Sequence, residues 1–363
     1  MSSIKIGISA INIKGNAGSV RIILSQIEYL SKNGFEVHCF AQKINKDEII
    51  KIGGIPHKIP RIFRRGHKAR ILFSFLSKLF MKANGIELVI GHGDNLVQDI
   101  LCLHNCVELA HEKVYGQNLS KKNSVLKMHY SQLLDKNLKV IIANSKLMKN
   151  DLISRYGINK EKIEVVYPGY NIKKFNYEEK IKVGTFKIGF ITSGDLVKRG
   201  VYNFIDAIEV FIKKHNFDMK VIIIGKAGKM IKELKKIISN KQLENIIEFI
   251  ESNDKIEEYY KNIDLMVHPA LFEEFGLVVQ EAIVCGTPVL TSKMVGASEL
   301  LEMGDENIFL MENSSKDEII KGLEYFLLDS GNLKKWNTIA KNIFKDNTEE
   351  KYNEKIKKII YSI

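Results

Sequence analysis

Short apolar runs alternate along the chain with longer segments whose apolar positions recur every three or four residues. The short runs are rich in valine and isoleucine, as buried parallel strands are, and the longer segments have the periodicity of amphipathic helices. In the first half we expect strands at 5–11, 36–42, 88–93, 100–105, 140–145 and 163–169. In the second half we expect strands at 187–193, 220–226, 246–252, 265–270, 288–293 and 307–312. This alternation predicts an α/β fold in which helices cover parallel sheets.

The length of 363 residues is about twice that of a usual domain, which favours two domains. Pro168 and Gly169 end a strand, and the polar stretch that follows lacks apolar periodicity, so residues 167–180 are the predicted linker. We expect an N-terminal α/β domain at 1–170, a C-terminal one at 171–340, and a final helix at 341–363 that packs back on the first domain.

Composition excludes several classes of protein. Hydrophobic residues make up 45% of the chain and charged residues 27%, which is ordinary globular composition and not that of a disordered or collagen-like chain. The four cysteines lack any CxxC spacing, which favours a reducing compartment. Cys102, His104 and Cys106 could face one side of a strand and hold zinc, but a fourth ligand is lacking and buried thiols are common, so we expect no metal.

Targeting signals are not evident. The sequence contains no run of eighteen apolar residues, so no transmembrane helix is expected. The N-terminal apolar stretch is short, is interrupted by Lys14 and lacks a basic leader, which indicates a first strand rather than a signal peptide. We expect a cytoplasmic protein.

Positive charge is concentrated in the first half. Residues 1–170 contain 26 lysines and arginines against 13 acidic residues, a net charge of +13, whereas residues 171–363 carry 29 against 30, a net charge of −1. The densest basic part, residues 57–82, leads into a strongly apolar helical stretch. Such a segment could meet anionic lipid head groups, or it could be a buried helix with a solvated basic approach.

The most informative segment is HPALFEEFGLVVQEAIVCGTPVL at 268–290. A strand ends near Pro269, an acidic loop follows, and Gly276 permits a tight turn into a helix. Free N–H groups at a helix start can bind phosphate, and carboxylates accept hydrogen bonds from sugar hydroxyls. Glu273 in the loop and Glu281 in the helix could therefore hold two polyols on either side of a diphosphate.

This segment resembles the retaining glycosyltransferases of family 4, whose signature is two glutamates separated by seven residues. The resemblance implies a GT-B fold, with two facing Rossmann-like domains and an interdomain cleft. It implies that Glu281 binds the ribose of a donor nucleotide and Glu273 the transferred sugar. The implied donor-binding set further includes Phe275, Gly276, Leu277 and Val278, with Asn253 near the base.

Three other segments fit the same resemblance. In SGDLVKRG (193–200), Lys198 and Arg199 stand near the family's diphosphate-binding cations. In the first loop, Gly15, Gly18 and Arg21 correspond to the family's glycines and arginine beside the donor phosphate. His104 ends a predicted strand where many family members carry a histidine close to the sugar. Glu274 stands where the family usually has glycine.

The resemblance implies retaining transfer of a hexose from a nucleotide-diphosphate sugar, in this case a UDP-sugar, without a metal. The motif pattern is closest to the lipopolysaccharide core hexosyltransferases. We therefore expect a lipid-linked or lipopolysaccharide-type glycan acceptor at an anionic membrane surface, with the enzyme peripheral on the inner face of the cytoplasmic membrane. A polyisoprenoid-linked acceptor and a nucleotide-sugar epimerase remain alternatives. No motif indicates nucleic-acid binding, and GKAGK at 225–229 lacks P-loop spacing.

Overall fold

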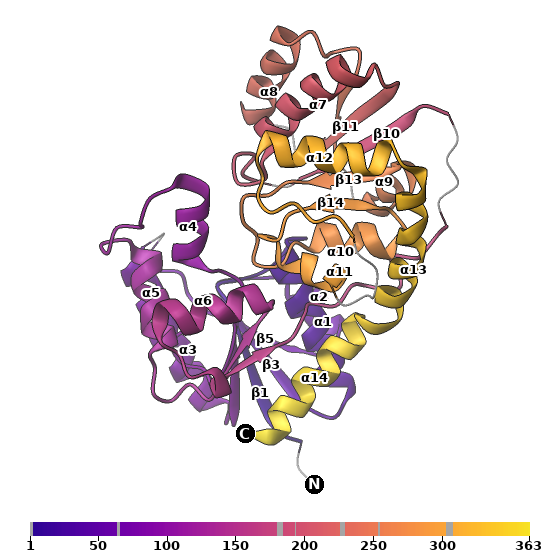
Figure 1. The fold of residues 1–363 in the computed structure, drawn as a ribbon. Coiled ribbons are helices and arrows are strands. Elements are labelled where there is room, and N and C mark those ends of the chain that lie inside the picture. Colours follow the sequence, from indigo (N-terminus) through magenta and orange to yellow (C-terminus); the bar gives the residue numbers. More distant parts are fainter. Residues whose placement is uncertain are drawn as a thin grey trace. The chain divides into compact units, whose positions relative to one another are not determined.

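The computed structural model describes residues 3–63, 66–179, 184–192, 194–225, 229–252, 255–302 and 308–363. The chain forms two compact units. Domain 1 comprises Met1–Gly169 and Glu349–Ile363, and domain 2 comprises Tyr170–Thr348. Each is a parallel sheet covered by helices, which confirms the predicted pair of Rossmann-like domains (Figure 1).

The described part of domain 1 contains a seven-stranded parallel sheet in the order β5-β3-β1-β6-β7-β8-β9. Its strands are β1 (Lys5–Ser9), β3 (Glu36–Ala41), β5 (Ile55–Lys58), β6 (Leu88–Gly91), β7 (Ile100–Cys102), β8 (Val140–Ala143) and β9 (Ile163–Val165). A small second sheet pairs β2 (Asn12–Ile13) with β4 (Lys43–Ile44). The edge strand β5 was not predicted, because it is short, contains Pro56 and is only partly buried.

The helices of domain 1 follow the strands in the alternation that the sequence predicted. They are α1 (Gly18–Lys32), α2 (Lys46–Lys51), α3 (His67–Ala83), α4 (Val107–Tyr115), α5 (Ser124–Leu133), α6 (Lys146–Tyr156), the short η1 (Lys160–Lys162) and α14 (Glu349–Ser362). In α1, apolar residues at helical spacing, including Val20, Ile23, Ile27 and Leu30, are buried.

The last helix completes the core of domain 1. α14 packs beside α1 (Figure 1), and its Ile356 and Ile360 are buried in the same apolar cluster as Ile23 and Ile27. Burial of such a side chain contributes about 1.5–3 kcal/mol, which is enough to hold the helix there. The helical tail predicted from residue 341 is thus divided, because the preceding helix α13 (Ser330–Asp346) packs in domain 2 against α10 (Leu277–Val284).

The described part of domain 2 contains a five-stranded parallel sheet in the order β12-β11-β10-β13-β14. Its strands are β10 (Phe186–Ile191), β11 (Met219–Gly225), β12 (Ile247–Glu251), β13 (Leu265–His268) and β14 (Val289–Thr291). Besides α10 and α13, its helices are α7 (Val201–His215), α8 (Lys229–Asn240), α9 (Ile256–Asn262), η2 (Gly296–Ser298), α11 (Glu299–Glu302) and α12 (Lys316–Leu327).

One sequence expectation for domain 2 was wrong. The predicted strand at 307–312 is not a strand over its described residues, and only Met311 makes an isolated bridge, to Ser292. The boundary between the two units, at Gly169 and Tyr170, falls inside the predicted linker 167–180, and the second part of that linker packs in domain 2. Its residue Phe175 is 1% exposed and packs edge-on against Tyr260, with ring centroids 6.1 Å apart.

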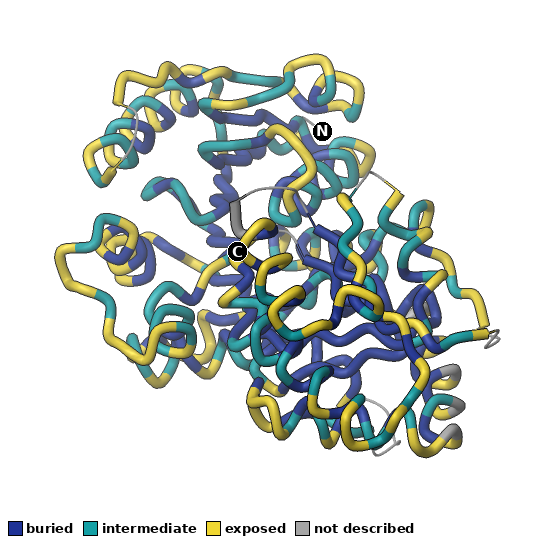
Figure 2. Tube along the Cα trace, turned by 90° about the horizontal axis from the view of Figure 1, so that it is seen from above, coloured by how far each residue is buried: buried dark blue, intermediate teal, exposed yellow. Residues whose placement is uncertain are grey.

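Burial follows the layered plan within each domain. Figure 2 shows buried strands and exposed outer helix faces and loops. None of the helices in the described ranges is long and apolar enough to cross a membrane.

Candidate functional site

Two loops of domain 2 meet at the carboxyl ends of neighbouring strands, where ligands bind in open parallel sheets. The loop after β10 contains Lys198 and Arg199, and the loop after β13 contains Glu273. The backbone N–H of Leu271 donates to the carbonyl oxygen of Lys198 at 2.9 Å. The structure therefore brings together the cationic and acidic motifs that the sequence singled out.

Gly200 makes this close approach feasible. Its φ is +74°, and a Cβ atom there would lie 2.0 Å from the carbonyl oxygen of Pro269. Just before it, Asp195 Oδ1 accepts the backbone N–H groups of Val197 and Lys198 at 2.9 and 3.3 Å. This turn fixes the direction of the cationic loop, as aspartate side chains commonly do in turns.

Both predicted cations are paired with carboxylates. Arg199 forms an ion pair with Glu273, which is 5% exposed. Lys198 Nζ lies 3.2 Å from Glu274 Oε2. The four formal charges sum to zero, so a diphosphate bound here would compete with Glu273 and Glu274 for the two cations.

His268 belongs to this cluster, although the sequence analysis gave it no role. The imidazole is 1% exposed, and its Nε2 lies 3.8 Å from Glu273 Oε2. Burial, assisted by the nearby Arg199, lowers the pKa of His268 well below 6.5, so the ring is neutral at neutral pH. Neither ring nitrogen has a hydrogen-bond partner within the part of the chain that the structure describes.

The acidic loop is held rigidly at the start of α10. Gly276 has a φ of +94°, and a Cβ atom there would lie 2.8 Å from Val295 Cγ1 and 3.2 Å from Glu273 Oε2. The Ala297 N–H donates to the carbonyl oxygen of Phe275 at 2.6 Å. Only glycine fits this turn, which leads directly into Leu277 and Val278 at the first turn of α10.

Glu281 lies inside α10 and is 4% exposed. The hydroxyl of Tyr260 on α9 donates to Glu281 Oε2 at 2.8 Å. A carboxylate has several acceptor positions, so this bond orients Glu281 and leaves it able to accept more. The sequence analysis did not identify Tyr260, because it lies on α9, outside the motif that contains Glu281. Asn253 falls outside the described residues.

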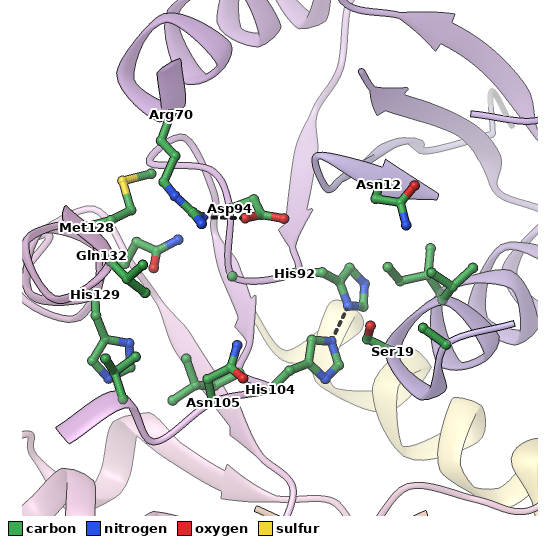
Figure 3. Close-up of a pocket in the computed structure, with 17 residues that line it drawn as sticks. Asn12, Ser19, Arg70, His92, Asp94, His104, Asn105, Met128, His129 and Gln132 are labelled. Carbon is green, nitrogen blue, oxygen red and sulfur yellow. Dashed lines mark hydrogen bonds and ion pairs between the residues drawn. The ribbon is translucent and has the colours of Figure 1, made fainter. Parts of the chain in front are cut away.

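Domain 1 has a pocket of about 210 Å³ at the carboxyl ends of β6 and β7 (Figure 3). It includes His104 and Asn105, as the sequence predicted for the end of this strand. Asn12, Ser19, Arg70, His92, Asp94, His129 and Gln132 also line it, and none of these was predicted. Gly15, Gly18 and Arg21 are not among the lining residues. From the same segment, Ala17 and Ser19 line the pocket instead.

His104 takes part in a chain of side chains. His92 Nε2 lies 3.0 Å from Gln26 Oε1, and His92 Nδ1 lies 2.9 Å from His104 Nε2 (Figure 3). Because Gln26 Oε1 can only accept, His92 carries its proton on Nε2 and accepts the N–H of His104. Burial lowers the pKa of His104 to about 4, so this histidine is neutral near pH 7.

The cation of this pocket is also paired. Arg70 Nη1 reaches from α3 to within 2.7 Å of Asp94 Oδ1 (Figure 3). Asp94 Oδ2 accepts the backbone N–H of Ile11 at 3.1 Å. Burial raises the pKa of Asp94, and the interactions with Arg70 and Ile11 oppose that rise. The pocket therefore offers mainly neutral donors and acceptors.

The four cysteines are buried, and none of them forms a disulfide. Over the described ranges, no three histidine, cysteine or acidic side chains are grouped so that they could hold a metal ion. The Cys102, His104 and Cys106 trio is therefore not such a group.

Two family profiles match the sequence. Residues 17–174 match "Glycosyltransferase Family 4", and residues 173–346 match "Glycosyl transferases group 1". An uncharacterized glycosyltransferase of Methanocaldococcus jannaschii is 27% identical over 235 residues, which are 56% of this chain and 59% of that protein.

A second relative has a named activity. It is the N-acetylgalactosamine-N,N'-diacetylbacillosaminyl-diphospho-undecaprenol 4-alpha-N-acetylgalactosaminyltransferase of Campylobacter jejuni. This protein is 25% identical over 221 residues, 60% of this chain and 59% of the relative. The chain thus spans about three fifths of the length of these two relatives.

Solved structures share the fold over almost the whole chain. WaaG, a glycosyltransferase involved in lipopolysaccharide biosynthesis, has a TM-score of 0.79 at 16% identity and covers 98% of this chain and 99% of its own. Anabaena HepE in complex with UDP-glucose has a TM-score of 0.77 at 18% identity, covering 99% and 100%. At these identities the likeness establishes the fold.

Proposed function

We propose that this chain, which belongs to the glycosyltransferases of family 4 and has the GT-B fold, transfers a hexose from a nucleotide-diphosphate sugar to a glycan acceptor at a membrane. The transfer proceeds with retention of the anomeric configuration. The family membership comes from the two matching profiles. The donor, the stereochemistry and the acceptor are our proposals.

The observation that carries the proposal is the arrangement of buried groups around the start of α10. Glu273, with Arg199 and His268 beside it, and Glu281, oriented by Tyr260, are both almost completely buried. Burial of two carboxylates costs free energy unless something is gained from it, and sugar hydroxyls are the natural donors to such acceptors. We assign Glu281 to the ribose and Glu273 to the transferred sugar.

The cations take the diphosphate. Arg199 and Lys198 stabilise the charge that develops on the departing phosphate, together with the backbone amides of Phe275, Gly276 and Leu277 at the start of α10. When the diphosphate binds, it displaces the carboxylates of Glu273 and Glu274 from these cations. Glu273 is thereby freed to accept a hydrogen bond from the sugar.

In the proposed step, the bond between the anomeric carbon and the leaving phosphate oxygen breaks through an oxocarbenium-like transition state. The acceptor hydroxyl oxygen attacks the same face of the sugar, and its proton passes to the departing phosphate oxygen. Atoms and charges balance without a metal or another base. His104 contributes a neutral imidazole to the polar pocket of domain 1, to which we assign the acceptor.

We propose a UDP-sugar as donor, supported by the fold shared with HepE, which was solved with UDP-glucose. The acceptor proposed first is a lipopolysaccharide core glycan, in line with the motif pattern and the shared fold of WaaG. The Campylobacter jejuni relative favours a polyisoprenoid-diphosphate glycan as the second candidate. Either acceptor is lipid-anchored, so we place the enzyme on the inner face of the cytoplasmic membrane, as a peripheral protein.

The test is a transfer assay with UDP-glucose labelled at the anomeric carbon, with each acceptor class and with EDTA present. Nuclear magnetic resonance of the product should show the α-anomer that the donor contains, formed only when an acceptor is supplied. A β-linked product would contradict retention. Conversion of the donor sugar without any acceptor would instead indicate a nucleotide-sugar epimerase, and loss of activity with EDTA would contradict the metal-free step.

A further inference from the structure

Helix α3 of domain 1 has two apolar faces, but only one of them packs in the protein. Its inner face buries Phe73 and Met81 in an apolar cluster that includes Phe40 of β3. Its outer face exposes Ile71, Phe75 and Leu79, which are 44%, 57% and 50% exposed. These three residues are spaced four apart, so they form one continuous stripe along the helix.

Lysines lie on the same face as this stripe. Lys68, Lys78 and Lys82 lie three residues from Ile71, Phe75 and Leu79 respectively, which places them on the same exposed face. None of the three lysines makes an ion pair with the residues that the structure describes. The surrounding sequence from residue 49 to residue 86 contains nine lysines and arginines and no aspartate or glutamate.

We propose that the outer face of α3, made of Ile71, Phe75 and Leu79 with Lys68, Lys78 and Lys82, is an interfacial helix that docks domain 1 on a bilayer rich in anionic lipids. The apolar side chains enter the region between head groups and acyl chains, while the lysines contact lipid phosphates. Long lysine side chains extend to reach the head groups while their stems remain beside apolar surface.

The charge pattern favours a membrane over other occupants. A second copy of the chain, paired through the same face about a two-fold axis, would bring the lysines of both copies together and repel. A nucleic acid would satisfy the lysines but would leave three large apolar side chains against phosphates. An anionic bilayer satisfies both kinds of side chain at once.

The same helix also reaches the pocket of domain 1. Arg70, adjacent in sequence to Ile71, points into the pocket and pairs with Asp94 (Figure 3). A helix that lies in the interface would therefore hold this pocket near the head groups, where a lipid-anchored glycan would be found. This last point rests on the proposed function, whereas membrane docking itself does not.

The experiment measures binding of the full chain to vesicles of equal parts phosphatidylglycerol and phosphatidylcholine, and to vesicles of phosphatidylcholine alone. The wild type should bind the anionic vesicles and not the neutral ones. The triple variant I71S/F75S/L79S should bind at least about tenfold more weakly. The triple variant K68Q/K78Q/K82Q should lose roughly fivefold per lysine at low salt.

Matched controls lie on domain 2. The variant I172S/V210S/L328S removes three other exposed apolar side chains, and K232Q/K236Q/K316Q removes three other exposed lysines. Both should bind the anionic vesicles like the wild type. Equal losses in these controls, or unchanged binding by both α3 variants, would overturn the proposal.

A second readout reports insertion directly. The only native tryptophan, Trp336, is 1% exposed, so wild-type emission should not change with vesicles. In the variant F75W, the introduced indole should shift to shorter wavelength on anionic vesicles and be quenched by brominated acyl chains. An unchanged emission with bound protein would overturn insertion by this face, and concentration-dependent self-association abolished by I71S/F75S/L79S would assign the face to a second copy instead.

Failure of docking and failure of the proposed transferase are separable. The variant I71S/F75S/L79S should keep the melting temperature of the wild type and its stabilisation by UDP-glucose, because the three side chains are exposed on α3 in domain 1 and the proposed donor site lies in domain 2. If the wild type binds anionic vesicles, the variant does not, and the wild type shows no transferase activity, only the enzymatic proposal fails. If the variant binds anionic vesicles like the wild type, docking by α3 fails whatever the transferase activity is.

Discussion

The two candidate sites contain different kinds of side chain. The site of domain 2 uses charged side chains from two loops, with Arg199 and Glu273 buried against each other. The pocket of domain 1 uses neutral imidazoles and amides from several separate elements, and its cation Arg70 is paired with Asp94. One site is suited to phosphate charge, and the other to uncharged hydroxyl groups.

This difference has an energetic basis. A buried ion pair is a poor source of stability, because removing two charges from water costs about as much as their attraction returns. The presence of the Arg199–Glu273 pair in domain 2 therefore favours binding of a charged ligand, which would replace Glu273 as the partner of Arg199. The histidines of domain 1 avoid that cost by remaining neutral, since burial lowers the pKa values of His104 and His129 to about 4.

The largest expected effect comes from removing the buried cation of domain 2. R199A should lower kcat/KM for transfer by about a thousandfold, because the leaving diphosphate loses a preorganised positive charge. R199K should fall between R199A and the wild type, since it keeps the charge and loses the planar fork. Steady-state kinetics measure both, with thermal unfolding as the check on folding. A loss below tenfold in R199A would remove Arg199 from the site.

The buried neutral histidines of domain 1 predict that the protein loses stability in acid. The pKa of His129 falls from 6.5 to about 4 on folding, so the unfolded chain takes up the proton first as pH decreases. Stability is therefore complete above about pH 6.5 and is lost as pH falls toward 4, by up to about 3 kcal/mol for this residue. Glu108 opposes the lowered pKa and limits the loss.

Urea unfolding of H129Q at pH 6.5 and pH 4.5 measures this contribution. The variant should lose less stability between the two pH values than the wild type does. H111Q is the matched control, because the hydrogen bond between His111 and Gln117 is exposed. An identical pH dependence in H129Q and the wild type would show that His129 does not contribute.

Nucleotide affinity should depend on the second glutamate. E281Q should weaken UDP binding by about ten- to a hundredfold, as expected when a charged acceptor of hydrogen bonds is lost. Y260F should have a smaller effect, since it removes only the bond that orients Glu281. Titration calorimetry compares the two, and unchanged affinity in E281Q would exclude the ribose role.

The smallest expected effect is a gain in affinity for UDP. Glu274 pairs with Lys198 at 3.2 Å and competes with phosphate for it. E274Q should therefore tighten UDP binding by up to about fivefold, the range of a partly exposed ion pair. Weaker UDP binding in this variant would mean that Glu274 itself contacts the nucleotide.

The sequence was most informative where the site is local. Glu273, Gly276 and Glu281 lie in one loop and the helix that follows, so a short segment and its resemblance to family 4 were enough to identify them. The cationic loop was found for the same reason, although its pairing with Glu273 and Glu274 was not predicted. The alternation of strands and helices likewise predicted both domains, because it depends on neighbouring residues.

Contacts between distant segments could not be predicted in this way. His92 precedes His104 by twelve residues and lies on the neighbouring strand connection, so only the sheet order brings the rings together. Tyr260 lacks a motif, and His268 begins the segment at 268–290 without an assigned role; both become visible through burial beside the glutamates. The predicted strand at 307–312 shows the converse, since over its described residues, 308–312, the apolar run forms only an isolated bridge between Met311 and Ser292.

The most direct test is a thermal-shift panel of the wild type and E281Q with UDP-, GDP- and ADP-sugars in the absence of metal, since a ligand that binds only the folded state raises the melting temperature. The charged site of domain 2 predicts a clear rise for the wild type with one nucleotide sugar and little or none for E281Q. H104Q, which alters only the pocket of domain 1, should respond to UDP like the wild type. No rise with any nucleotide sugar in the folded wild type, or an equal rise in E281Q, would contradict the donor site proposed for domain 2.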